Sequence, residues 1–166
     1  MKRVLQWVLL ATVLAGWAQA IWQHDRLPER VATHFNAAGR ANGWMSRDQH
    51  LVWQLATFTF VGLLMQGLLT LQRHLPAEYV NLPHRDYWLA PERRAATEDW
   101  LGSLYLVSGS LLSLFFLAIF HLVYRANLDP TPSLTTWVWP LGLVLTGSIL
   151  ALVFVVLRRF SRRPVS

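Results

Sequence analysis

Apolar and polar residues are segregated along this chain into long blocks. Four apolar runs, each about twenty residues long, cover residues 4–22, 51–71, 101–124 and 137–157. A helix rises ~1.5 Å per residue and the hydrocarbon core of a bilayer is ~30 Å thick, so each run can cross a membrane once. The pattern predicts an all-α membrane protein, a four-transmembrane-helix bundle in a single membrane domain that covers residues 1–166.

The first run has a second interpretation. Ala18 and Ala20 supply the small residues that a signal peptidase inspects, so residues 1–20 could be a secretory signal that is removed. We favour an uncleaved span, because four crossings place both basic ends of the chain on one side. A mature protein that starts at Ile21 would remove the first helix.

The polar segments between the runs carry the signals for turns and helix starts. Pro91 suits the first position of a helix and Glu92 its first turn. No breaker follows before Tyr124, so we expect one helix over 91–124, about 51 Å long, that extends beyond the membrane. In the first loop, residues 23–50, we expect turns at Gly39 and at the pair Asn42-Gly43, where the backbone needs a positive φ.

Small residues spaced four apart predict where helices approach closely. Gly109 and Ser113 form such a pair in the third run, and Gly147 and Ala151 form one in the fourth.

Charge predicts the orientation. Of the fifteen Lys and Arg residues, ten lie in the two ends of the chain and in the 72–100 loop. The positive-inside rule therefore places both termini and this loop in the cytoplasm, with the 23–50 and 125–136 loops outside. The net charge of +6 lies beside apolar runs, which indicates contact with lipid head groups and not with nucleic acid. The absence of cysteine excludes disulfides and thiolate metal sites.

Two polar motifs carry a family resemblance. The first is Thr33-His34-Phe35-Asn36 with Gly39 and Gly43-Trp44, and the second is Asn81-Leu82-Pro83 with Tyr87-Trp88-Leu89-Ala90-Pro91-Glu92-Arg93-Arg94. With these motifs the chain resembles the SdpI-like family of integral-membrane proteins over roughly residues 4–124. That family includes an immunity and signalling protein that protects its bacterium from a secreted toxic peptide. The resemblance implies a multi-pass protein of the bacterial inner membrane with a binding, immunity or sensory role.

The motifs supply the candidate ligand- or partner-binding residues, which are His34, Asn36, Gly39, Trp44, Tyr87, Trp88, Glu92, Arg93 and Arg94. His34 can ligate a metal or move a proton, and Asn36 can hydrogen-bond a ligand or fix the imidazole tautomer. The alternative is structural, with His34 bonded to backbone in a loop that covers the helix ends. The second motif could likewise dock a partner or anchor the start of the long helix.

Four histidines are expected on the outer side, namely His24, His34, His50 and His121. Together they could hold a zinc or copper ion, although their spacing matches no metal motif. We therefore predict no cofactor, with a divalent metal as the alternative.

The leading hypothesis is a non-catalytic binding, immunity or sensory module, or an accessory subunit, whose partners are membrane lipids and a peptide or another membrane protein. No Asp, Glu, Lys or Arg lies at the centre of a run, which argues against an ion-coupled transporter. Glu92, Glu98 and Asp99 are expected to be paired surface acids, because no matched acid, base and nucleophile surround them. The alternatives are a membrane-embedded enzyme or metal-binding protein that uses His34, and a structural subunit of a larger complex.

Overall fold

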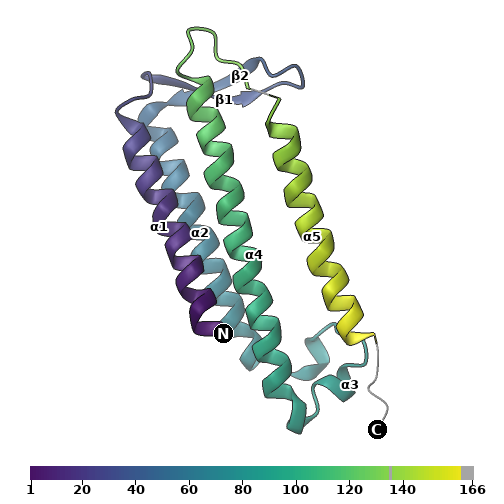
Figure 1. The fold of residues 1–166 in the computed structure, drawn as a ribbon. Coiled ribbons are helices and arrows are strands. Elements are labelled where there is room, and N and C mark those ends of the chain that lie inside the picture. The colour runs from purple at the N-terminus through teal and green to yellow at the C-terminus, as the bar shows by residue number, and fades with distance from the viewer. Residues whose placement is uncertain (135, 162–166) are drawn as a thin grey trace.

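Four long helices form the body of the protein in the computed structural model, which describes residues 1–134 and 136–161 (Figure 1). Helices α1 (Lys2–His24), α2 (Arg47–His74) and α4 (Pro91–Ala126) pack together, and α5 (Val138–Phe160) lies beside α4. All four are long and apolar enough to cross a membrane. The predicted all-α fold with four transmembrane helices is confirmed, and the chain has the architecture of a multi-pass membrane protein.

Two of the long helices begin at residues that favour a helix start. Helix α4 has Pro91 at its first position, as predicted, and runs for 36 residues. Helix α2 starts before its apolar run because Ser46 and Gln49 form a capping box, in which each side chain accepts a hydrogen bond from the other residue's backbone N–H at 3.1 Å. Polar residues thus extend the helices past the apolar runs.

The bundle has two different ends (Figure 1). At the hairpin end, the segment between α1 and α2 forms the strands β1 (Arg30–Phe35) and β2 (Ala41–Ser46). At the opposite end, which we call the α3 end, lie the N-terminus, the short helices η1 (Ala77–Tyr79) and α3 (Arg85–Trp88), and the last turn of α5.

The hairpin differs from the turns that the sequence predicts. Gly39 lies at its tip with a φ of +76°, as expected. The turn predicted at Asn42-Gly43 is wrong, because both residues lie within β2 and Gly39 alone has a positive φ among the described glycines. Gly43 lies opposite His34, and a Cβ there would come 3.0 Å from the His34 Cβ. The glycine therefore makes room for the imidazole and does not reverse the chain.

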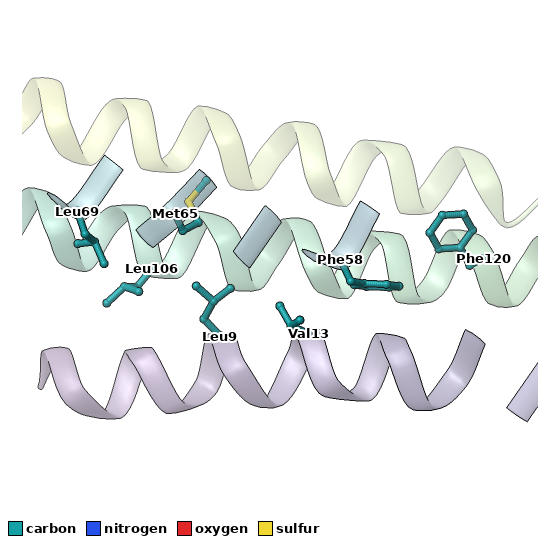
Figure 2. Close-up of a cluster of buried hydrophobic side chains, with 7 residues drawn as sticks. All are labelled: Leu9, Val13, Phe58, Met65, Leu69, Leu106 and Phe120. Carbon is teal, nitrogen blue, oxygen red and sulfur yellow. The ribbon is translucent and has the colours of Figure 1, made fainter. Parts of the chain in front are cut away.

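The apolar core lies between α1, α2 and α4 (Figure 2). Its buried members are Leu9, Val13, Phe58, Met65, Leu69, Leu106 and Phe120. Two glycines bring the helices together, since a Cβ on Gly16 would lie 2.5 Å from the Phe58 ring and one on Gly109 would lie 2.4 Å from the Met65 Cγ. The close approach predicted at Gly109 is confirmed. At Gly147 in α5 a Cβ would meet nothing within 4 Å, so this predicted approach is not formed.

Helix α5 has an open apolar surface. The helix is apolar enough to cross a membrane, yet among its 23 residues only Phe160 is buried. The helix is held at its last residue, Phe160, whose ring lies 5.2 Å from those of Trp88 and Trp100 at the α3 end. Lipid or another protein must therefore cover most of α5 in the membrane.

Candidate functional site

Asn127 fastens the hairpin to the bundle. It follows the last residue of α4 and is buried, and its side-chain Oδ1 accepts a hydrogen bond from the Ala32 N–H at 2.7 Å. Its Nδ2 donates to the Ala32 carbonyl at 2.8 Å and to the Val123 carbonyl at 2.9 Å. The Asn127 amide thus replaces a neighbouring strand at the edge of β1, which satisfies backbone groups that would otherwise be buried and unpaired.

The hairpin tip is built by Asn36. Its Oδ1 accepts hydrogen bonds from the backbone N–H groups of Ala38 and Arg40, both at 3.0 Å, and its carbonyl accepts one from Gly39. The Gly39 carbonyl in turn accepts from the Leu134 N–H at 2.8 Å, so the tip is joined to the loop between α4 and α5. Asn36 therefore has a structural role in the turn, which the sequence motif did not reveal.

An open cleft of about 550 Å³ lies between the hairpin and the loop after α4. Its lining residues are Pro28, Arg30, Trp44, Asn127, Leu128, Asp129, Pro130 and Pro132. Trp44, the predicted site residue among them, is 47% exposed. Arg30 and Asp129 contribute opposite charges from the two sides of the cleft. The cleft therefore combines an exposed aromatic ring with a cation and an anion on walls stiffened by proline.

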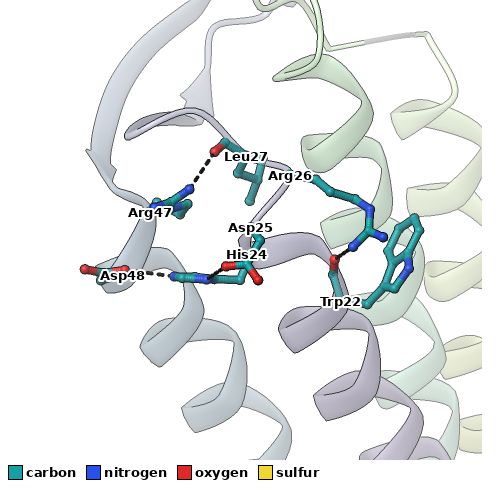
Figure 3. A network of polar contacts seen from close by, with 7 residues as sticks. All are labelled: Trp22, His24, Asp25, Arg26, Leu27, Arg47 and Asp48. Atoms are coloured by element: carbon teal, nitrogen blue, oxygen red, sulfur yellow. Dashed lines mark hydrogen bonds and ion pairs between the residues drawn. The ribbon is translucent and has the colours of Figure 1, made fainter.

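A polar network beneath the hairpin joins the end of α1 to the start of α2 (Figure 3). The His24 ring lies between two carboxylates, with its Nδ1 2.8 Å from Asp25 Oδ1 and its Nε2 2.8 Å from Asp48 Oδ1. Arg47 donates to the Leu27 carbonyl at 3.4 Å. His24 thus links the end of α1 to the start of α2.

Arg26, in the same network, folds back on α1. It donates a hydrogen bond to the Trp22 carbonyl and places its guanidinium 4.2 Å from the centre of the Trp22 ring (Figure 3).

The four histidines proposed as metal ligands are not gathered into one group. Within residues 1–134 and 136–161, no group of three or more His, Asp or Glu side chains is placed to hold a metal ion. His34 is exposed on β1, where its Nδ1 lies 3.2 Å from the Thr33 hydroxyl. His121 is exposed, with its ring 6.1 Å from that of Tyr124. His50 is buried against Phe120, with ring centroids 6.0 Å apart.

Near the hairpin end, the bundle also encloses polar side chains that the sequence did not mark as a set. Gln23 on α1 and His50 and Gln54 on α2 are each at most 2% exposed. Both side-chain polar atoms of Gln23, both ring nitrogens of His50 and the Gln54 Oε1 have no hydrogen-bond partner in the described part of the chain. The helical spacing could have identified them, because Gln23 continues the buried row of Gly16 and Ala20 on α1 at intervals of three and four residues. His50 and Gln54 likewise lie eight and four residues before buried Phe58 on α2.

The second motif forms a cluster at the α3 end. Trp88 donates to the Phe160 carbonyl at 3.3 Å and accepts at its own carbonyl from the Thr97 hydroxyl at 2.9 Å. Arg94 donates to the Leu75 carbonyl, at the end of α2, at 2.8 Å. The Arg93 guanidinium lies 4.1 Å from the centre of the Tyr87 ring. The motif therefore holds the ends of α2, α4 and α5 together.

The three acids of this region are paired, as predicted. Glu92 lies 2.6 Å from Arg93, Glu98 lies 2.7 Å from Arg94, and Asp99 lies 2.9 Å from Lys2.

Comparison with curated proteins and with solved structures gave no match. Residues 11–60 match the model of a domain of unknown function, DUF1648. The matched segment includes most of α1, the whole hairpin and the first half of α2, so the hairpin and its junction with the helices lie in the part of this chain that is similar to DUF1648.

Proposed function

We propose that this protein is a non-catalytic membrane module that binds a short extended segment of another polypeptide in the cleft beside the hairpin. The observation that carries the proposal is that exposed Trp44, Arg30 and Asp129 line the same cleft. Aromatic residues dominate the energy of many protein interfaces, and the cleft volume of about 550 Å³ lies in the range of ligand sites.

The form of the cleft favours a peptide over an enclosed small molecule. Because the cleft is open and not enclosed, an extended chain can lie in it while a few of its side chains are bound. Arg30 can bind a carboxylate of the ligand, and Asp129 can bind an ammonium or guanidinium group. Pro28, Pro130 and Pro132 limit the backbone freedom of the walls, which lowers the entropy lost on binding.

Orientation and family are part of the same proposal. The positive-inside rule supports a hairpin end that faces the outside of a bacterial inner membrane, with both termini in the cytoplasm. The two motifs support an SdpI-like protein, for which a secreted peptide is the corresponding ligand class. In this account the cluster around Arg94 and Trp88 stabilises the cytoplasmic ends of the helices.

A randomised peptide library tests the proposal. The full-length protein in lipid nanodiscs is incubated with the library, and bound peptides are sequenced for the wild type and for Trp44→Ala. Loss of a central aromatic residue costs about 2 kcal/mol or more, so affinity for the enriched peptides should fall roughly thirtyfold. Trp139→Ala is the control, because Trp139 is 64% exposed near the hairpin end but does not line the cleft.

Either of two results would reject the cleft as the binding site. One is that no peptide is enriched over empty nanodiscs. The other is that Trp44→Ala and Trp139→Ala bind the enriched peptides equally well.

A further inference from the structure

A second groove lies on the side of the bundle, between α1 and α2, and encloses about 590 Å³. Its lining residues are Arg3, Gln6, Trp7, Leu9, Leu10, Val13, Trp17, Thr59, Gly62, Leu63, Gln66 and Leu106. Because α1 begins at the α3 end, Arg3 and Gln6 mark the mouth of the groove in the leaflet at that end. The groove is separate from the cleft beside the hairpin.

The lining of this groove becomes less polar from the α3 end towards the middle of the bundle. Arg3 stands at the mouth, and at ~1.5 Å per residue Gln6 lies about 4.5 Å deeper. Gln66 lies at a similar depth, because its neighbour Met65 and Leu9, three residues after Gln6, both approach Gly109. Beyond the amides the lining is mostly apolar, up to Trp17, about 21 Å along α1 from Arg3.

The polar groups at the mouth are available for a ligand. In the part of the chain that the structure describes, Arg3 has no ion-pair partner and the side chains of Gln6 and Gln66 have no hydrogen-bond partner. The neighbouring Lys2, by contrast, is paired with Asp99 at 2.9 Å. Amides that face hydrocarbon without a partner are costly, so a ligand with acceptors at this depth would be favoured.

A diacyl phospholipid has the same order of polarity, with an anionic phosphate outermost, ester carbonyls below it and an acyl chain beneath. We infer that this groove binds one anionic phospholipid from the leaflet at the α3 end. Arg3 binds the phosphate, Gln6 and Gln66 donate to the ester carbonyls, and an acyl chain lies along Leu10 and Val13.

Lipid titration by native mass spectrometry tests the charge requirement. The delipidated full-length protein is titrated with phosphatidylglycerol and, separately, with phosphatidylcholine. A basic residue near a membrane surface contributes about 1 kcal/mol to binding of an anionic lipid, so Arg3→Gln should weaken phosphatidylglycerol binding about fivefold. Arg73→Gln removes the same charge near the same end of the bundle but outside the groove, and it should bind like the wild type.

Two leucine substitutions test the position of the acyl chain. Gly62 lines the groove, whereas at Gly67 on the same helix a Cβ would meet nothing within 4 Å. Gly62→Leu should fill the groove and reduce phosphatidylglycerol binding, while Gly67→Leu should leave it unchanged. Thermal unfolding of both variants separates loss of the lipid from loss of the fold.

Three results would overturn the inference. The first is equal binding of the two lipids by the wild type, and the second is equal binding of phosphatidylglycerol by Arg3→Gln and Arg73→Gln. The third is a dimer that Gly62→Leu dissociates and phosphatidylglycerol does not displace, since a second copy of the chain would then occupy the groove.

Discussion

Replacing Asn127 by alanine should release β1 from the end of α4 while the helices stay folded. The substitution removes the hydrogen bonds from and to Ala32, at 2.7 and 2.8 Å, and the one to Val123 at 2.9 Å. The carbonyl of Val123 keeps a partner, because the backbone N–H of Asn127 also donates to it at 3.1 Å. Most of the free-energy cost therefore arises at the backbone N–H and carbonyl of Ala32, which lose their hydrogen-bond partner.

The magnitude follows from the burial of Ala32, which is 0% exposed. Each buried backbone group left without a partner costs ~1–3 kcal/mol, so its N–H and carbonyl together cost about 2–6 kcal/mol. Water entering from the adjacent cleft would offset part of this, and we expect about 3 kcal/mol. That free energy corresponds to roughly a 150-fold increase in local opening at β1.

Hydrogen–deuterium exchange of the Ala32 amide, measured on the full-length protein in detergent micelles, reports this opening directly. The matched control is Asn42→Ala, because Asn42 is exposed in β2 and its side chain has no hydrogen bond among the described residues. The reasoning is refuted if Ala32 exchanges as slowly in Asn127→Ala as in Asn42→Ala. Exchange that rises equally throughout α4 would also contradict it, since the helix itself would then have been disrupted.

Three further substitutions test the rest of the fold through thermal unfolding in one detergent. Gly39→Ala should destabilise the hairpin tip by about 1–2 kcal/mol, because the φ of +76° disfavours a side chain and the added Cβ would lie 2.7 Å from the Leu134 carbonyl oxygen. Gly67→Ala is the control, and equal unfolding temperatures of the two variants would contradict the expectation. Arg94→Gln should cost about 1–3 kcal/mol, because it leaves the Leu75 carbonyl and Glu98 without their donor, whereas Arg93→Gln removes a more exposed ion pair and should cost roughly 1 kcal/mol or less. A larger loss of stability in Arg93→Gln than in Arg94→Gln would show that the hydrogen bond from Arg94 to the Leu75 carbonyl, at the end of α2, is unimportant. Gly16→Leu should cost about 1–3 kcal/mol by overpacking against the Phe58 ring, and Gly147→Leu should cost almost nothing; if the two variants unfold alike, α1 and α2 do not pack as described.

The helices were predictable because the membrane imposes a local requirement. Any stretch that crosses hydrocarbon must satisfy its own backbone and be apolar over about twenty residues, and both properties can be read from a short window of sequence. Pro91 and Gly39 were predictable for the same reason, since each acts on its own φ angle.

The attachment of the hairpin could not be predicted, because it depends on residues far apart in the chain. Asn127 binds Ala32, which lies 95 positions away. The role of Gly43 depends on the strand register, which places it opposite the His34 ring. An Asn-Gly pair most often marks a turn, but here it lies within β2 because the chain reverses at Gly39.

The candidate site was predicted only in part. The motif identified Trp44, which lines the cleft, but also His34, which does not. Arg30 begins β1, and Asp129 and the three prolines lie in loops that carry no recognisable pattern. The fold brings them together through the hydrogen bonds between Asn127 and Ala32. Asn36 accepts hydrogen bonds that stabilise the turn, and this structural role explains its presence without a ligand.

Site-specific photo-crosslinking in living cells tests most directly whether the cleft binds a polypeptide. A photoreactive phenylalanine analogue replaces Trp44 in one full-length protein and Trp139 in another, so that the probe lies in the cleft or outside it near the same end of the bundle. A polypeptide should be crosslinked from position 44 and not from position 139, and a peptide enriched from the library should displace it. If position 44 captures only lipid, or if both positions capture the same products, the cleft is not a polypeptide-binding site.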